Sequence, residues 1–221
     1  MKTCLITGTS TGIGFATAIH LARNGYKVYA TMRNLEKCGE LKGITENEGL
    51  PLEIKILDVT KAYSIDECLD QIFDLEGRID VLINNAGLSN SCPVESYPEE
   101  EHRELFEANY WGPVNLTQKV LPQMRERGEG MIINVSSLLG KIAWANQAAY
   151  CASKHAVEAF SEALAQEVSP FGIKVVIIQP GVIASAIFEN TPVHYDKHSP
   201  YKQSMRRNGR FYNIGIANST P

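Results

Sequence analysis

Short apolar segments alternate with segments of helical periodicity along most of the chain, and this alternation restricts the possible folds more than any other feature. The strand-like runs are residues 3–7, 27–31, 54–57, 80–83, 131–135 and 174–178. Helical periodicity covers residues 12–24, 64–73, 98–127 and 147–168. Apolar runs that are separated by helices predict a parallel sheet with helices on both faces.

Several local signals predict where helices begin and end. Asn24-Gly25 indicates a helix C-terminus, because glycine adopts the left-handed conformation at little cost. Ser64 and Glu67 have the spacing of a capping box, which predicts a helix that begins at Ser64. Pro98 is typical of the first turn of a helix and marks the start of the long helical region.

Composition indicates an ordinary globular protein. The chain has 221 residues, 44% hydrophobic and 21% charged, which suits a single domain with a substantial core. A net charge of −4 without a basic stripe gives no reason to expect nucleic acid or a membrane surface as a partner. The five cysteines contain no C-x-x-C pair, and no apolar run is long enough to span a membrane. We therefore expect reduced thiols, no metal site and a cytoplasmic location.

A glycine-rich loop joins the first strand to the first helix. It runs from Thr7 to Gly14 and contains Gly8, Gly12 and Gly14. Glycines at such a junction allow the backbone to approach a pyrophosphate, and the helix N-terminus supplies free N–H groups. A tight turn without a ligand would use the same residues, but the position at the first strand–helix junction favours a dinucleotide site.

A second group of residues has the chemistry of proton transfer. Tyr150 and Lys154 are one turn apart on a predicted helix, so their side chains share a face. Such a pair often arises by chance, but Ser137 at the end of the fifth strand and Asn109 in the long helical region precede it. A phenol has a pKa near 10, and a neighbouring ammonium group lowers it toward the neutral range.

The order and spacing of these motifs resemble the short-chain dehydrogenase/reductase family. The resemblance rests on the G-x-x-x-G-x-G loop, the run Asn84-Asn85-Ala86-Gly87, and Asn109, Ser137, Tyr150 and Lys154 in that order. It covers residues 1–186 and implies a single doubly wound, Rossmann-type α/β sheet. The Tyr-Cys-Ala-Ser-Lys run at residues 150–154 is similar to the hydroxysteroid and retinol dehydrogenase branch.

The resemblance also implies a role for each residue of the catalytic group. Tyr150 would exchange a proton with the substrate oxygen, and Ser137 would hydrogen-bond the same oxygen. Lys154 would lower the pKa of Tyr150 and hold the nicotinamide ribose. Asn109 would anchor a water molecule that links Lys154 to solvent. This chemistry requires no metal.

The same resemblance implies a set of cofactor-binding residues. They are Gly8, Ser10, Gly12, Ile13, Gly14, Arg33, Asp58, Val59, Asn85, Ala86, Gly87, Tyr150, Lys154, Pro180, Gly181, Ile183 and Ser185. Asp58 would bind the adenine amino group, and Ile183 and Ser185 would hold the nicotinamide carboxamide. The second strand ends at Met32-Arg33 without a carboxylate, and arginine can pair with a 2′-phosphate. NADP(H) is therefore favoured over NAD(H), with Arg33 and Ser10 at the phosphate.

The sequence thus predicts one domain, in which residues 187–221 form a substrate lid or tail. The leading hypothesis is an NADP(H)-dependent oxidoreductase that acts on an alcohol or carbonyl substrate. One alternative is a non-catalytic NAD(P)-binding sensor. The other is an inactive, truncated family member, since the family's last helix and strand have no counterpart in this sequence. The helices at 98–127 and 147–168 resemble the pair through which members of this family associate, which implies a homodimer or homotetramer. Aromatic residues of the lid suggest a lipophilic substrate, and they are Phe188, Tyr195, Tyr201, Phe211 and Tyr212.

Overall fold

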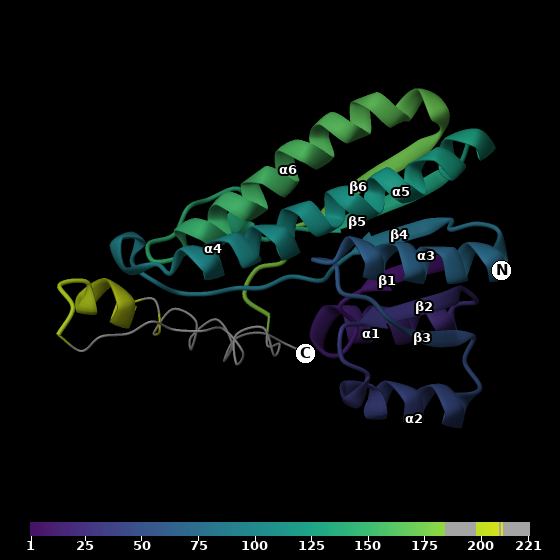
Figure 1. Cartoon of the computed structure of the whole chain (residues 1–221), viewed down its shortest axis with the longest axis horizontal. Helices are drawn as coiled ribbons and strands as arrows, with labels where there is room; N and C mark the ends of the chain where they lie inside the picture. The colour runs from purple at the N-terminus through teal and green to yellow at the C-terminus, as the bar shows by residue number, and fades with distance from the viewer. Residues whose placement is uncertain (184–197, 208, 210–221) are drawn as a thin grey trace.

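Six parallel strands form one sheet in the order β3-β2-β1-β4-β5-β6 (Figure 1). The computed structural model describes residues 1–183, 198–207 and 209. The strands are β1 (Thr3–Thr7), β2 (Lys27–Met32), β3 (Leu52–Ile56), β4 (Val81–Asn84), β5 (Gly130–Val135) and β6 (Ile173–Ile178). This arrangement confirms the predicted doubly wound α/β fold, in which ligands bind where the strand order reverses.

Helices cover both faces of the sheet. They are α1 (Gly12–Arg23), α2 (Gly39–Glu48), α3 (Ala62–Glu76), α4 (Glu99–Phe106), α5 (Gly112–Arg127) and α6 (Ala148–Val168). Short helical turns lie at η1 (Leu35–Cys38), η2 (Val94–Ser96), η3 (Glu107–Trp111), η4 (Leu138–Gly140) and η5 (Ser169–Phe171). Helices α3, α5 and α6 share one core cluster with the sheet, and α1 and α2 share the other.

The strand period of two explains the division of the core. Leu5 of β1 belongs to the cluster under α3, α5 and α6, whereas its neighbour Ile6 belongs to the cluster under α1. Both side chains are fully buried, because successive residues of a strand point to opposite faces. Leu82 and Ile83 of β4 divide in the same way. Continuous apolar strands are therefore what a sheet covered on both faces requires.

A chain of buried polar side chains crosses from the sheet to α6. Asn84 and Asn134 are direct partners in the β4–β5 register, and the Asn84 Nδ2 donates to Asn134 Oδ1 at 2.8 Å. The Asn134 Nδ2 then donates to the Ser161 hydroxyl at 2.7 Å, and Ser161 donates to the Val157 carbonyl. These bonds fix α6 against the centre of the sheet. The bonded residue of α6, Ser161, follows Tyr150 and Lys154 in the same helix.

The predicted capping box at Ser64 is wrong. The residue that precedes α3 is Lys61, and Ser64 lies inside the first turn. Its buried hydroxyl accepts a hydrogen bond from the Asp58 N–H at 3.0 Å and so orders the loop after β3. A serine near a helix start can serve the preceding loop as readily as the helix itself.

The structure also differs from the sequence prediction in larger features. The long helical region is α4 and α5 joined by one π-helical turn, η3, rather than a single helix. Strand β3 begins at Leu52, two residues before the predicted run. Helix α2 was not predicted, because its ten residues are mostly polar and only Leu41 is buried. A surface helix with one apolar anchor leaves little periodicity to detect.

Other predictions concern the cysteines, membrane-spanning helices, metal-binding side chains and the aromatic residues of the lid. All five cysteines are free. In the described part of the chain, no helix is long and apolar enough to cross a bilayer, and no three metal-binding side chains cluster. Of the predicted lid aromatics, Tyr201 is described and is 38% exposed. The others, Phe188, Tyr195, Phe211 and Tyr212, lie outside the described residues, as does Ser185.

Candidate active site

A cavity of about 930 Å³ lies at the carboxyl ends of the strands. Loops that follow β1 to β6 all contribute to its wall, as expected where the strand order reverses. The predicted site residues that line it are Gly8, Ser10, Gly12, Ile13, Arg33, Asp58, Val59, Asn85, Ala86, Gly87, Ser137, Tyr150, Lys154, Pro180, Gly181 and Ile183. Gly14 and Asn109 are not part of the wall.

The glycine loop is shaped by close contacts that exclude side chains. Gly8 has a φ of +70°, and a Cβ atom there would lie 2.7 Å from the Ala86 Cα. Gly12 also has a positive φ, at +63°. A Cβ atom on Gly14 would collide with the Asn85 amide and the Gly8 carbonyl. Gly14 therefore packs the helix against the loop rather than lining the cavity, whereas Gly8 and Gly12 allow the turn itself.

Thr7 and Asn85 hold this loop against the end of β4. The Asn85 Nδ2 donates to the carbonyl oxygens of Thr7 and Gly8 at 2.8 and 2.9 Å. The Thr7 hydroxyl accepts hydrogen bonds from the backbone N–H groups of Asn85 and Ala86, both at 3.0 Å. The role of Thr7 was not predicted, although its place at the strand end, before the glycines, is the signal that could have revealed it.

The N-terminus of α1 opens onto the cavity and fits a phosphate group. Thr11 is its N-cap residue and makes no side-chain cap hydrogen bond, and the first turn carries no acidic residue. The amide groups of a first helical turn lack intrahelical partners and carry a partial positive charge. Because Gly12, the first residue of the helix, has no side chain, a pyrophosphate can approach these amides from the cavity.

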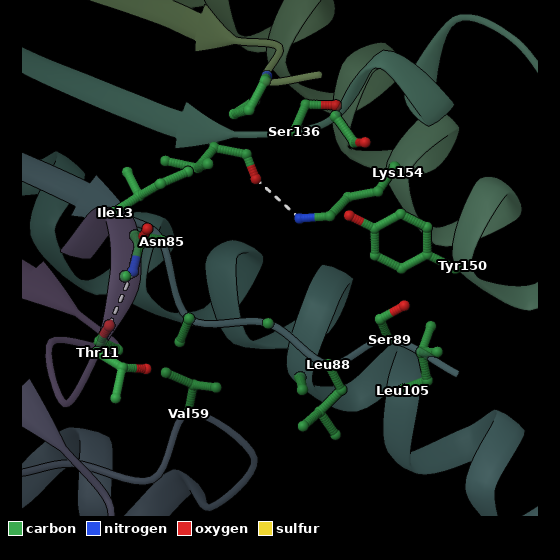
Figure 2. A pocket seen from close by; sticks show the side chains of 18 of the residues that line it. Thr11, Ile13, Val59, Asn85, Leu88, Ser89, Leu105, Ser136, Tyr150 and Lys154 are labelled. Carbon is green, nitrogen blue, oxygen red and sulfur yellow. Dashed lines mark hydrogen bonds between the residues drawn. The ribbon is translucent and has the colours of Figure 1, made fainter. Parts of the chain in front are cut away.

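Tyr150 and Lys154 lie side by side on the cavity wall, one turn apart on α6 (Figure 2). The Lys154 Nζ is 5.9 Å from the centroid of the Tyr150 ring and donates to the Val135 carbonyl oxygen at 2.8 Å. Only 5% of Lys154 is exposed, and this burial lowers its pKa to about 8. A lysine with so low a pKa in a cavity marks a candidate functional site.

The pKa of Tyr150 lies above its ordinary value, in contrast to the predicted lowering. Burial raises the pKa because it disfavours the phenolate, and a hydrogen bond with Ser137 opposes this effect without overcoming it. The Lys154 ammonium lies over the ring and donates to a backbone carbonyl, and it is not among the groups that shift the Tyr150 pKa. The geometry thus brings Ser137, Tyr150 and Lys154 together, but the protein groups alone do not produce the lowered pKa.

Asn109 lies behind the cavity, within the π-helical turn. Its Oδ1 accepts from the Leu88 N–H at 2.7 Å, and its Nδ2 donates to the Leu88 carbonyl and the Ser153 hydroxyl. The side chain is 1% exposed and is close to Gly87, where a Cβ atom would lie 3.1 Å from Asn109 Oδ1. Asn109 therefore fixes the loop after β4 against α6. Its predicted water-anchoring role remains a prediction.

Positive charge gathers where β2 ends. Arg33 lines the cavity and is exposed, and Lys37 on η1 lines the same region. Lys37 was not predicted, although it follows Arg33 by four residues. Asp58 follows β3, the strand paired with β2, and its Oδ1 accepts from the Thr60 N–H and hydroxyl at 3.0 and 2.8 Å. These bonds order the loop in which Asp58 was predicted to meet adenine.

Apolar residues also line the cavity, together with the polar and acidic Asn90, Glu101 and Glu104. Figure 2 shows Leu88, Ser89 and Leu105 beside the Tyr150 ring. Leu138, Leu139, Trp144 and Val182 extend this wall. None of these residues was predicted as part of the site, because they come from loops and one helix turn without a motif.

The strand order, the glycine loop and the paired tyrosine and lysine define a doubly wound α/β protein of the Rossmann class. The chain matches the short chain dehydrogenase family over residues 2–195, and it belongs to this family. This membership and the sheet confirm the resemblance that the motifs indicated.

Individual relatives agree with this membership. The chain is 42% identical to 3-ketodihydrosphingosine reductase of Bacteroides thetaiotaomicron over 84% of its own length and 65% of that protein. It is 38% identical to retinol dehydrogenase 8 of Bos taurus over 83% of its length and 60% of that protein. A crystal structure of a short-chain dehydrogenase from Streptomyces avermitilis superposes with a TM-score of 0.87 at 36% identity, covering 99% of this chain and 79% of that one. The chain therefore spans less than two thirds of the length of the ketodihydrosphingosine reductase and of the retinol dehydrogenase.

Proposed function

We propose that this chain is a nicotinamide-dependent oxidoreductase that moves hydride between NADP(H) and the carbon of an alcohol or carbonyl group. The observation that carries the proposal is the single cavity that joins the glycine loop to Tyr150 and Lys154. A pyrophosphate site and a proton donor in one cavity are what hydride transfer to a carbonyl requires. Family membership supports the same reaction class.

The bound nicotinamide would supply or accept the hydride and place a positive charge near the phenol in its oxidised form. Tyr150 donates its proton to the carbonyl oxygen during reduction and removes the hydroxyl proton during oxidation. Ser137, which already hydrogen-bonds Tyr150, stabilises the negative charge that develops on that oxygen. Lys154 binds the ribose hydroxyls, since its amine is buried beside Tyr150 at the cavity wall.

Other residues would orient the dinucleotide. The amides of Gly12 and Ile13 face the pyrophosphate, and Asn85, Ala86 and Gly87 border the adenine ribose. Pro180, Gly181 and Ile183 lie at the end of β6, where they support the nicotinamide. Ser185, which lies outside the described residues, and the adenine contact of Asp58 and Val59 complete the proposed set.

The proposal makes Tyr150 essential for turnover but not for cofactor binding. Tyr150→Phe keeps the ring and removes the proton donor, so we expect kcat to fall by about 10²- to 10⁴-fold. NADPH binding, followed by cofactor fluorescence, should change by less than about threefold. Tyr26→Phe, far from the cavity wall, is the control. Full turnover by Tyr150→Phe would overturn the assignment, and binding without any turnover in the wild type would favour a dinucleotide sensor.

The preference for NADP(H) rests on Arg33, with Lys37 and Ser10 beside it on the cavity wall. A charge-assisted hydrogen bond to a 2′-phosphate contributes about 1.5–3 kcal/mol, which corresponds to about 10- to 100-fold in affinity. Arg33→Ala should therefore weaken NADPH binding by that factor and leave NADH binding unchanged. Lys42→Ala, outside the cavity and paired with Glu46, is the control. Equal loss of both cofactors, or tighter binding of NADH by the wild type, would contradict the preference.

We further propose that the substrate is lipophilic. Leucines and Trp144 form much of the apolar part of the cavity wall, which also carries Glu101 and Glu104. Ketodihydrosphingosine and retinol, named in two relatives, are both lipids. A substrate screen should therefore compare long-chain ketones and alcohols with short ones.

Assembly and location belong to the same proposal. Helices α4 and α6 pack together, and Trp111 on the turn beside them is 46% exposed, so this face suits a homodimer or homotetramer. Five free cysteines suit the cytoplasm.

A further inference from the structure

A buried carboxylate lies one helical turn beyond Lys154. Tyr150, Lys154 and Glu158 follow one another at intervals of four residues on α6, so they occupy one face of the helix. Glu158 is only 3% exposed, although it forms no part of the proposed hydride-transfer chemistry. Burial of a carboxylate costs several kcal/mol unless hydrogen bonds and opposite charge compensate for it.

Compensation comes from two segments that contact the same carboxylate oxygen. The Gln179 Nε2 donates to Glu158 Oε2 at 2.8 Å, and the Lys141 Nζ lies 3.1 Å from the same oxygen. Burial raises the pKa of Glu158, but the nearby Ser136 hydroxyl, the Gln179 amide and the Lys141 ammonium group outweigh it and hold the pKa below its ordinary value. The group is therefore a carboxylate at neutral pH.

The first segment is the turn that follows Ser137. A Cβ atom on Gly140, at the end of η4, would lie 2.5 Å from the Ser136 hydroxyl and 3.1 Å from Glu158 Oε1. Glycine at this position thus lets the turn pack directly on the carboxylate. Lys141 follows Gly140 immediately, so its ion pair with Glu158 closes the same contact.

The second segment is the turn proposed to hold the nicotinamide. Gln179 immediately precedes Pro180 and Gly181 on the cavity wall. The Pro180 carbonyl also accepts from the Leu138 N–H at 2.9 Å, so the two turns are bonded to each other. Glu158 is the point at which both turns join α6.

The negative charge matters as well as the hydrogen bonds. Burial lowers the pKa of Lys154, and Glu158 opposes that effect through its charge. Within the described structure, the Tyr150 phenol of α6, the Val135 carbonyl of β5 and the Gly87 backbone after β4 also lie close to the Lys154 amine. Lys141 faces Glu158 from beyond η4. Glu158 is thus the carboxylate that favours the charged form of Lys154.

We propose that Glu158 is a positioning residue, which joins the turn after Ser137 and the Gln179–Gly181 turn to the helix that carries Tyr150 and Lys154. This role rests on the proposed function, because it assigns those turns to substrate and cofactor. Glu158 touches neither of them and acts through Ser137, Pro180 and Lys154.

Glu158→Gln tests the role of the charge with almost no change of shape. We expect the pKa of Lys154, followed by NMR of ¹³C-labelled lysine in the cofactor-free protein, to fall by on the order of one unit. The NADPH dissociation constant should rise about three- to tenfold, and kcat should fall more than KM rises. The pH dependence of kcat should move to lower pH together with the pKa of Lys154.

Two further variants separate the effect of the Glu158 charge from the effect of its hydrogen bonds to the two turns. Glu158→Asp keeps the charge but is one methylene shorter, so the Lys154 titration should stay near the wild-type value while NADPH binding weakens. Gln179→Leu removes a donor on the exposed turn and should weaken NADPH binding and lower kcat without lowering the Lys154 pKa. Because Gln179 is exposed, this variant provides the test even where Glu158→Gln does not fold.

Glu162→Gln is the matched control. Glu162 is on the same helix and pairs with the same Lys141 at 2.9 Å, but it is exposed and remote from Lys154. It should leave all readouts unchanged. A folded Glu158→Gln with an unchanged Lys154 titration and NADPH binding within twofold of the wild type would overturn the proposal. Absence of NADPH binding by the wild type would instead refute the proposed function, while the lysine titration would still report on Glu158.

Discussion

The amine of Lys154 lies in a buried environment, where the charged form of lysine is destabilised. It is buried, it donates to a backbone carbonyl, and its pKa is lowered to about 8 by that burial. The folded state therefore binds the Lys154 proton less tightly than the unfolded state does. Between the folded pKa and the ordinary value near 10.5, the unfolded chain holds a proton that the folded chain has released, so this residue makes stability rise with pH.

Replacement of Lys154 should separate stability from activity. Lys154→Met removes the buried charge, so it should be more stable than the wild type at pH 7 while losing most of its turnover. Its advantage in the free energy of unfolding should shrink by about 3 kcal/mol between pH 8 and pH 10.5, the equivalent of the shift in pKa. Urea unfolding of both proteins across this range measures the difference. Lys174→Met, at an exposed position of β6, should show no such trend, and a flat difference for Lys154→Met would contradict the argument.

At the level of elements, the junctions after β1 and β4 depend on one hydroxyl. Thr7 is 1% exposed and accepts hydrogen bonds from two backbone N–H groups of the loop that borders the cavity. Those two partly buried N–H groups would lose their partner if the hydroxyl were removed. The glycine loop and the loop after β4 therefore keep their relative positions through Thr7 as well as through Asn85.

Thr7→Val, which keeps the shape of the side chain, should destabilise the protein by about 2–4 kcal/mol, because each unsatisfied buried donor costs about 1–3 kcal/mol. Thr31→Val is the control: Thr31 is equally buried, but its hydroxyl only donates one bond, to the Ile6 carbonyl at 3.0 Å. Urea unfolding measures both variants. If Thr7→Val costs no more than Thr31→Val, the two accepted hydrogen bonds contribute little.

Sequence patterns predicted the elements that are apolar or carry a motif. The six strands, the glycine loop and the Tyr150–Lys154 pair were found because apolar runs, glycine spacing and helical spacing are local features. Helix α2 was missed because it buries a single leucine. Ser64 was assigned to a cap because the sequence does not reveal that its hydroxyl serves Asp58. The raised pKa of Tyr150 depends on burial by distant segments, which no local pattern contains.

At the scale of the whole molecule, the cavity draws on loops from every strand, so a bound dinucleotide should stabilise the entire fold. At a free concentration of about 100 times the dissociation constant, a ligand adds about 2.7 kcal/mol to the free energy of unfolding. For a chain of this size, this corresponds to a rise in Tm of about 5–10 °C. Thermal melting with NADPH should show this rise in the wild type and in Tyr150→Phe, which retains the glycine loop, Arg33 and Lys154. Unchanged Tm with both NADPH and NADH would contradict a dinucleotide site.

The buried amides of Asn84 and Asn134 also bear on how the chain reaches this fold. Apolar strands of similar length can pair in several alignments, since valine, leucine and isoleucine pack against one another almost equally well. A slip of β5 by one residue would turn Asn134 to the opposite face of the sheet, away from both Asn84 and Ser161. The side-chain amides of Asn84 and Asn134 would then lose these buried partners, at a cost of about 1–3 kcal/mol each. Asn84 and Asn134 thus specify the register of β4 and β5 and make mispaired sheets unfavourable during folding.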